Sequence, residues 1–134
     1  MNLIEKLLRV DKEAALARET KTIPSKRLSK LVGEGAEITI KEIPGRKYSE
    51  LQSMLYDSKG NRRVDKMYDF NLMCCVNGIV EPSLTDKTLM EHFGASTPKD
   101  LVAILFGLES STIASEIIAL SGLADDAEEE VKNS

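Results

Sequence analysis

Residues 20–43 read TKTIPSKRLSKLVGEGAEITIKEI and carry the clearest β-strand signal in this 134-residue chain. Side chains alternate along residues 37–43, which places Ile38 and Ile40 on one face of an extended segment. Because Gly-Glu-Gly precedes this segment and supplies a turn, we predict a β-hairpin over residues 26–43. A lone hairpin is unstable in water, so helices must cover one of its faces.

The segment before the hairpin predicts an amphipathic helix from Asn2 to about Ala17. Asn2 can cap this helix, with Glu5 at the third helical position. The apolar stripe is narrow and the other face is charged, so the helix would cover an edge of the domain or pack against a partner. The stripe consists of Leu3, Leu7, Val10 and Ala14, joined by Ile4, Leu8 and Ala15.

Short helices are predicted after the hairpin, because apolar residues recur at helical spacing between breaks at glycine, proline and asparagine. The chain therefore predicts an α+β fold: an N-terminal helix, one β-hairpin, and then a bundle of four to five short helices. We expect these helices at about residues 46–57, 65–76, 85–93, 97–106 and 110–121.

Three segments differ in composition. Residues 1–19 form the amphipathic helix, and residues 20–123 form a single α+β domain, which is long enough to bury a core. Residues 124–134 are acidic and poor in apolar side chains, so we expect a disordered tail. Aromatic residues make up 4% of the chain and Trp is absent, so the core must rest on aliphatic side chains.

Composition also bears on the compartment. No apolar run approaches the ~20 residues that a membrane helix requires, and the first residues lack an apolar stretch of the signal-peptide type. The two cysteines, Cys74 and Cys75, are adjacent, so no disulfide framework is present. We therefore expect a cytoplasmic protein that does not contact membranes.

Few residues are available for catalysis or metal binding. His92 is the single histidine, so any Ser-His-Asp or Cys-His arrangement would have to use it. We expect it instead to end a short helix, where a cation favours the helix dipole. A zinc site needs four ligands in paired spacing, whereas Cys74 and Cys75 are adjacent and distant from His92. We predict no enzymatic activity, no cofactor and no metal ion.

Charge is unevenly distributed along the chain. Residues 1–80 hold fifteen basic and eleven acidic side chains, a net charge of +4, whereas residues 81–122 hold two and six, a net charge of −4. This difference in sign would support self-association or capture of a charged partner, or it reflects an ordinary solvated surface. The densest basic cluster, Lys59 to Arg63, lacks interleaved aromatic residues, so we expect a solvated loop and no nucleic-acid binding.

Several short blocks, read in order, carry a resemblance to one family. The order is similar to that of the XkdN-like tail-assembly chaperones of contractile-tailed phages and defective prophages of Gram-positive bacteria, over roughly residues 20–123. The blocks are IPSKRL at 23–28, EITIKEI at 37–43, VNGIVEP at 76–82, LMEHFG at 89–94, TPKDLV at 97–102, LFGLE at 105–109 and IIALSG at 117–122.

The resemblance implies a chaperone that coats the long, helical tape-measure protein before the tail tube polymerises, with the tail-tube protein as a second candidate partner. Such a protein needs an apolar surface from which it can be displaced. The candidate partner-binding residues form two sets, and each residue could instead belong to the core. The sets are Leu101, Leu105, Phe106, Ile113 and Ile117, and the stripe Leu3, Leu7 and Val10.

Two other classes stay open at this point. The first is a small structural subunit of a phage tail or tail-like particle, such as a baseplate or tail-completion protein. The second is a small regulatory or nucleic-acid-binding protein that uses the basic residues between Lys59 and Lys66.

Overall fold

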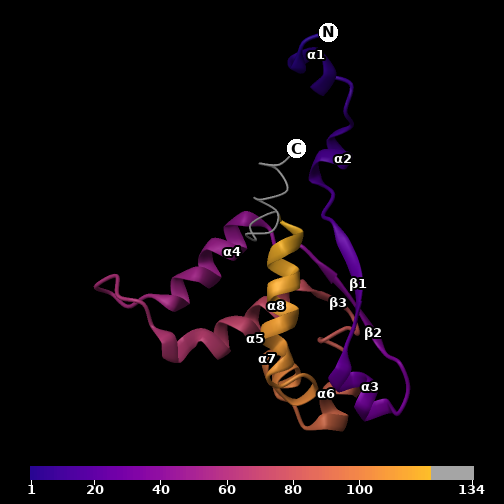
Figure 1. Cartoon of the computed structure of the whole chain (residues 1–134), viewed down its shortest axis with the longest axis vertical. Helices are drawn as coiled ribbons and strands as arrows, with labels where there is room; N and C mark the ends of the chain where they lie inside the picture. Colours follow the sequence, from indigo (N-terminus) through magenta and orange to yellow (C-terminus); the bar gives the residue numbers. More distant parts are fainter. Residues whose placement is uncertain (122–134) are drawn as a thin grey trace.

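A computed structural model describes residues 1–121 and has an α+β architecture, which confirms the predicted fold class (Figure 1). The expected acidic tail, residues 124–134, lies outside the described residues. The strands are β1 (Thr20–Pro24), β2 (Glu37–Lys41) and β3 (Ile79–Glu81). Within residues 1–121 the α-helices are α1 (Leu3–Leu7), α2 (Lys12–Leu16), α3 (Lys26–Val32), α4 (Gly45–Gln52), α5 (Met67–Gly78), α6 (Lys87–Phe93), α7 (Pro98–Leu105) and α8 (Glu109–Leu120), with 3-10 helices η1 (Ser53–Leu55) and η2 (Val64–Lys66).

The sheet has the order β1-β2-β3, and both strand pairs are antiparallel. Ile23 of β1 lies opposite Ile38 of β2, and Ile40 of β2 lies opposite Ile79 of β3. All four isoleucines are buried, so one face of the sheet is aliphatic and belongs to the core. The alternation in residues 37–43 therefore predicted the buried face of β2 correctly.

The antiparallel pair predicted over residues 26–43 exists, but its first strand is β1, and the segment between the two strands is helix α3. Ser25 caps this helix, because its hydroxyl oxygen accepts a hydrogen bond from the Leu28 N–H at 3.1 Å. Gly33, predicted as part of a hairpin turn, ends α3 in the left-handed region with φ of +81°. The hairpin boundary was wrong because a capped helical turn interrupts the strand pattern.

The predicted N-terminal helix from residue 2 to residue 17 is two five-residue helices, α1 and α2, separated by residues 8–11. Asn2 does cap α1, accepting a hydrogen bond from the Glu5 N–H at 2.9 Å. Every residue from Met1 to Thr22 is exposed, and Figure 1 shows this segment extending away from the sheet. Because isolated helices of this length are marginal in water, nothing holds a continuous helix here. We call residues 1–18 the arm.

The later helices match the sequence more closely. Asp86 caps α6 and Thr97 caps α7, with side-chain oxygens 2.8 and 3.1 Å from the N–H groups three residues on. The predicted helix over residues 46–57 is shorter, because α4 ends at Gln52 and η1 follows. The sequence did not predict β3, since three residues are too few to show an alternating pattern.

Helices α5 and α8 pack against each other at the centre of the molecule, and α8 also contacts β2. Gly78, the last residue of α5, makes this close approach possible. A Cβ atom placed on Gly78 would lie 2.5 Å from Ile117 Cδ1 on α8, and the Ile117 side chain is fully buried. Gly78 is therefore a packing residue, and it does not adopt the left-handed conformation that glycine often takes at a helix end.

We predict that Gly78→Ala lowers the free energy of unfolding by about 1–3 kcal/mol, because the added methyl group overpacks the contact between α5 and α8. Urea unfolding measures the change. Gly35→Ala is the control, since a Cβ atom at Gly35 meets nothing within 4 Å. Equal stability of Gly78→Ala and the parent chain would contradict this account of the helix contact.

Candidate functional site

The structure separates the two predicted partner-binding sets. All five residues of the C-terminal set are buried in the core, where they pack among α5, α7, α8 and the sheet. Each of them is at most 4% exposed, so their helical spacing reflects packing within the chain. They are Leu101, Leu105, Phe106, Ile113 and Ile117.

The other predicted set, the stripe Leu3, Leu7 and Val10, is exposed along the arm. No residue of α1 or α2 is buried. These two short helices therefore have nothing in the described chain to pack their apolar face against. The stripe is therefore the exposed one of the two sets.

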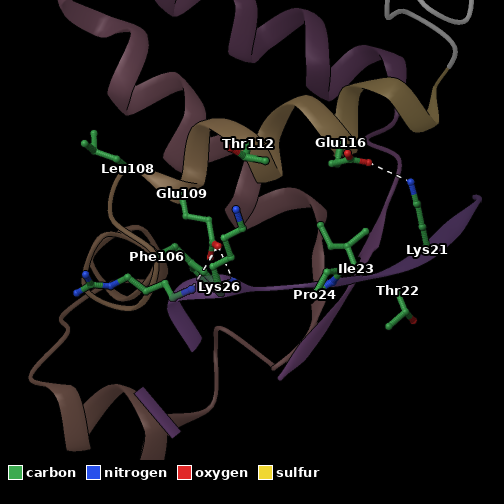
Figure 2. Close-up of a pocket in the computed structure, with 11 residues that line it drawn as sticks. Lys21, Thr22, Ile23, Pro24, Lys26, Phe106, Leu108, Glu109, Thr112 and Glu116 are labelled. Carbon is green, nitrogen blue, oxygen red and sulfur yellow. Dashed lines mark hydrogen bonds and ion pairs between the residues drawn. The ribbon is translucent and has the colours of Figure 1, made fainter. Parts of the chain in front are cut away.

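An open groove lies between β1, the start of α3 and the first two turns of α8 (Figure 2). Its volume is about 900 Å³. Sequence reasoning missed this groove, because the segments that line it are far apart along the chain. We call it the β1–α8 groove, and its lining residues are Lys21, Thr22, Ile23, Pro24, Lys26, Arg27, Phe106, Leu108, Glu109, Thr112 and Glu116.

Glu109 organises the groove. This half-buried residue opens α8, and its carboxylate accepts hydrogen bonds from the Ser25 hydroxyl at 2.5 Å, the Lys26 N–H at 2.8 Å and the Arg27 N–H at 3.3 Å. These donors belong to the first turn of α3 and its cap, where unpaired N–H groups and the helix dipole favour an anion. The Arg27 Nε also donates to the Leu105 carbonyl oxygen at 3.3 Å. Together these bonds fix α3 against the loop that joins α7 to α8.

An ion pair also lies along the same groove. The Lys21 ammonium group on β1 is 3.1 Å from a Glu116 carboxylate oxygen on α8 (Figure 2). Glu109 and Glu116 are two of the six acidic residues in the segment 81–122, and both bind basic or N–H groups of the N-terminal half. Some of the charges that make the net charge of the two halves opposite in sign are therefore used in contacts within one molecule.

Leu108 is the most exposed large apolar residue of the described chain and lies at the rim of the groove, with 84% of its surface accessible. Gly107, at φ of +54°, gives the loop before α8 a left-handed bend just before Leu108. Pro24 also lines the groove, whose floor reaches the buried side chains of Ile23 and Phe106. The combination offers apolar contact beside two carboxylates, Glu109 and Glu116, that already have partners within the chain.

The groups considered for catalysis lie elsewhere. Cys74 and Cys75 are fully buried in α5, and burial raises the pKa of the Cys74 thiol to about 11 and that of Cys75 to about 12. Thiols with such pKa values are almost entirely protonated near neutral pH and are poor nucleophiles. His92 lies in the last turn of α6, as predicted, and its ring is nearly perpendicular to that of Phe93.

The basic loop between α4 and α5 is held by local contacts. Asp57 accepts hydrogen bonds from the N–H groups of Lys59 and Asn61, and Arg63 pairs with Asp65 at 2.9 Å. Within residues 1–121, no three His, Cys, Asp or Glu side chains gather as a metal site would require. Over the same residues no single helix has the length and apolar character of a membrane span, although the pair α7–α8, bent by 115°, passes on length and composition together.

The described surface is thus that of a small α+β protein with an apolar groove and an apolar arm. A family model described as "Phage XkdN-like tail assembly chaperone protein, TAC" matches residues 4–133, nearly the whole chain. The chain belongs to this family, which places it in phage tail assembly, in a role that is not catalytic. Comparison with curated proteins and comparison with solved structures each gave no match.

We predict that Glu109→Ala lowers the free energy of unfolding by about 1–3 kcal/mol, because three donors at the start of α3 lose their charged acceptor. Chemical denaturation measures the loss. Glu116→Ala is the matched control, since an exposed ion pair such as Lys21–Glu116 contributes only about 0–1 kcal/mol. If the two variants are equally stable, Glu109 does not have the organising role described above.

We also predict that iodoacetamide at pH 8 alkylates both thiols of the folded chain at least about 100-fold more slowly than those of the unfolded chain, because burial raises the pKa and blocks access. Mass spectrometry of timed samples, with and without urea, measures the two rates. Rapid labelling of either thiol in the folded chain would contradict the burial of this pair.

Proposed function

We propose that this protein is a tail-assembly chaperone that binds the tape-measure protein in the bacterial host cytoplasm and promotes assembly of the tail tube around it. Membership of the tail-assembly chaperone family is the observation that carries the proposal. The client surface is the β1–α8 groove, and its occupant is an apolar helix face of the tape-measure protein. The protein acts by binding and release, without catalysis.

The composition of the groove supports a reversible apolar contact. Leu108 stands at the rim, where burial against a client would remove its apolar surface from water at no cost to the fold. The nearby carboxylates of Glu109 and Glu116 already have partners, so an apolar helix could bind without leaving either charge unpaired. The part of α8 that lines the groove runs from Glu109 to Glu116, about 10 Å, or roughly two helical turns of a client.

A helix suits this groove better than an added strand. β1 is an edge strand, and edge strands can pair with a strand from another protein. However, Pro24 has no N–H to donate, and Lys21 places a charged side chain on the same short strand. Proline and lysine are features by which natural edge strands resist pairing.

A structural subunit of the tail is the alternative that the family assignment makes less favourable. Purified tails distinguish the two, because a structural subunit stays in the finished particle and a chaperone leaves it. Detection of this chain in stoichiometric amounts in mature tails would contradict the proposal.

We predict that Leu108→Glu weakens binding of a tape-measure segment by about tenfold or more, since it places a charge against the apolar face of the client. Co-expression and pull-down of the two proteins, followed by titration calorimetry, measure the change. Val64→Glu is the matched control, because Val64 is 73% exposed on η2 and does not line the groove. Equal binding by both variants would contradict the groove as the client surface.

A further inference from the structure

The apolar stripe on the arm has no cover in the described chain. Leu3, Leu7 and Val10 are 69%, 59% and 51% exposed. Several aliphatic side chains exposed together are typical of an interaction surface, because contact with another molecule would remove their apolar surface from water. The spacing and charges of the arm indicate which occupant fits this surface.

The spacing of the stripe points to a coiled coil. Leu3, Leu7, Val10, Ala14 and Ala17 are separated alternately by four and three residues, which is the spacing of a and d positions in a heptad repeat. Leu7 and Ala14 take the a positions, and the other three take the d positions. This narrow seam suits a two-stranded contact with another helix.

The charges beside the seam identify the second helix. In a parallel pair, each g residue lies next to the e residue that follows it by five positions in the other helix. Lys6 at g would face Asp11 at e of a second copy, and Glu13 at g would face Arg18 at e. Both contacts join opposite charges, and each contact occurs twice because the pair of arms has two-fold symmetry. The arm is therefore complementary to itself.

These charged groups are available in the single chain. Asp11 stands at the N-cap of α2, but its side chain makes no capping hydrogen bond. Within residues 1–121, Lys6, Asp11 and Glu13 form no ion pair, and Arg18 makes only a long contact of 3.9 Å with Glu42. Pairing of two arms would thus use charges that the fold leaves largely unused.

We propose that the arms of two copies associate as a parallel, two-stranded coiled coil in which residues 3–18 form one continuous helix. The break over residues 8–11 belongs to the single chain, where five-residue helices have no packing to extend them. Association buries the stripe and supplies that packing. This inference goes beyond the proposed function, and it concerns a surface outside the β1–α8 groove.

Sedimentation velocity and circular dichroism of the full chain at increasing concentration test the association. We expect the mass to rise from 14.8 kDa toward twice that value, with helix content rising in parallel as residues 8–11 become helical. A chain that stays monomeric across the range overturns the proposal. So does dimerisation without a gain in helix content, because the continuous helix would then be absent.

Charge reversals test the parallel register. Lys6→Glu and Asp11→Lys each turn two attractive contacts into repulsive ones, so each variant alone should raise the dimer dissociation constant by about tenfold. An equimolar mixture of the two variants should recover the parent affinity, because all g–e contacts in the mixed dimer again join opposite charges. Lys12→Glu, the same charge change at an f position that points away from the seam, should leave association unchanged.

Failure of the mixture to recover the parent affinity overturns the parallel arrangement, since in an antiparallel pair the carboxylate introduced by Lys6→Glu would still lie against Glu13 of the other copy.

The experiments distinguish failure of this inference from failure of the proposed function. If the arm reversals weaken capture of the tape-measure segment while the parent chain is monomeric, the arm binds client and not a second copy. If the Leu108→Glu variant binds client normally but the mixture recovers, only the groove assignment falls.

Discussion

The structure depends on one carboxylate placed at the start of a helix. Glu109 opens α8 and at the same time accepts hydrogen bonds from Ser25, Lys26 and Arg27 at the start of α3. This contact joins segments that are far apart along the chain. It also positions one wall of the β1–α8 groove relative to the other, because β1 ends where α3 begins. Without it, the N–H groups of this turn would be left without their charged acceptor, which costs stability.

The sequence predicted those parts of the fold that follow local rules. The buried face of β2, the caps at Asp86 and Thr97, and the order of the later helices all come from patterns a few residues long. It failed where tertiary contacts decide. Residues 26–32 look like a strand until Ser25 and Glu109 satisfy the first turn of a helix, and the second of these lies far along the chain.

The candidate site was predictable only in part, for the same reason. Leu101, Leu105 and Ile117 share a helical spacing with the arm stripe, and spacing alone cannot tell a core face from a binding face. Leu108 carries no pattern at all, because it is a single apolar residue in a loop, and its exposure depends on the bend at Gly107. The groove exists only once β1 and α8 lie side by side (Figure 2).

The exposed arm has a consequence for how such a protein can change over time. No residue before Ile23 is buried, so substitutions in the arm remove no core contact and carry almost no folding penalty. Residues of the body, such as Ile117 against Gly78, have no comparable freedom. The arm can therefore diverge among related chains while the body stays constant. Sequence variation should concentrate in this exposed segment and spare the residues that maintain the packed body.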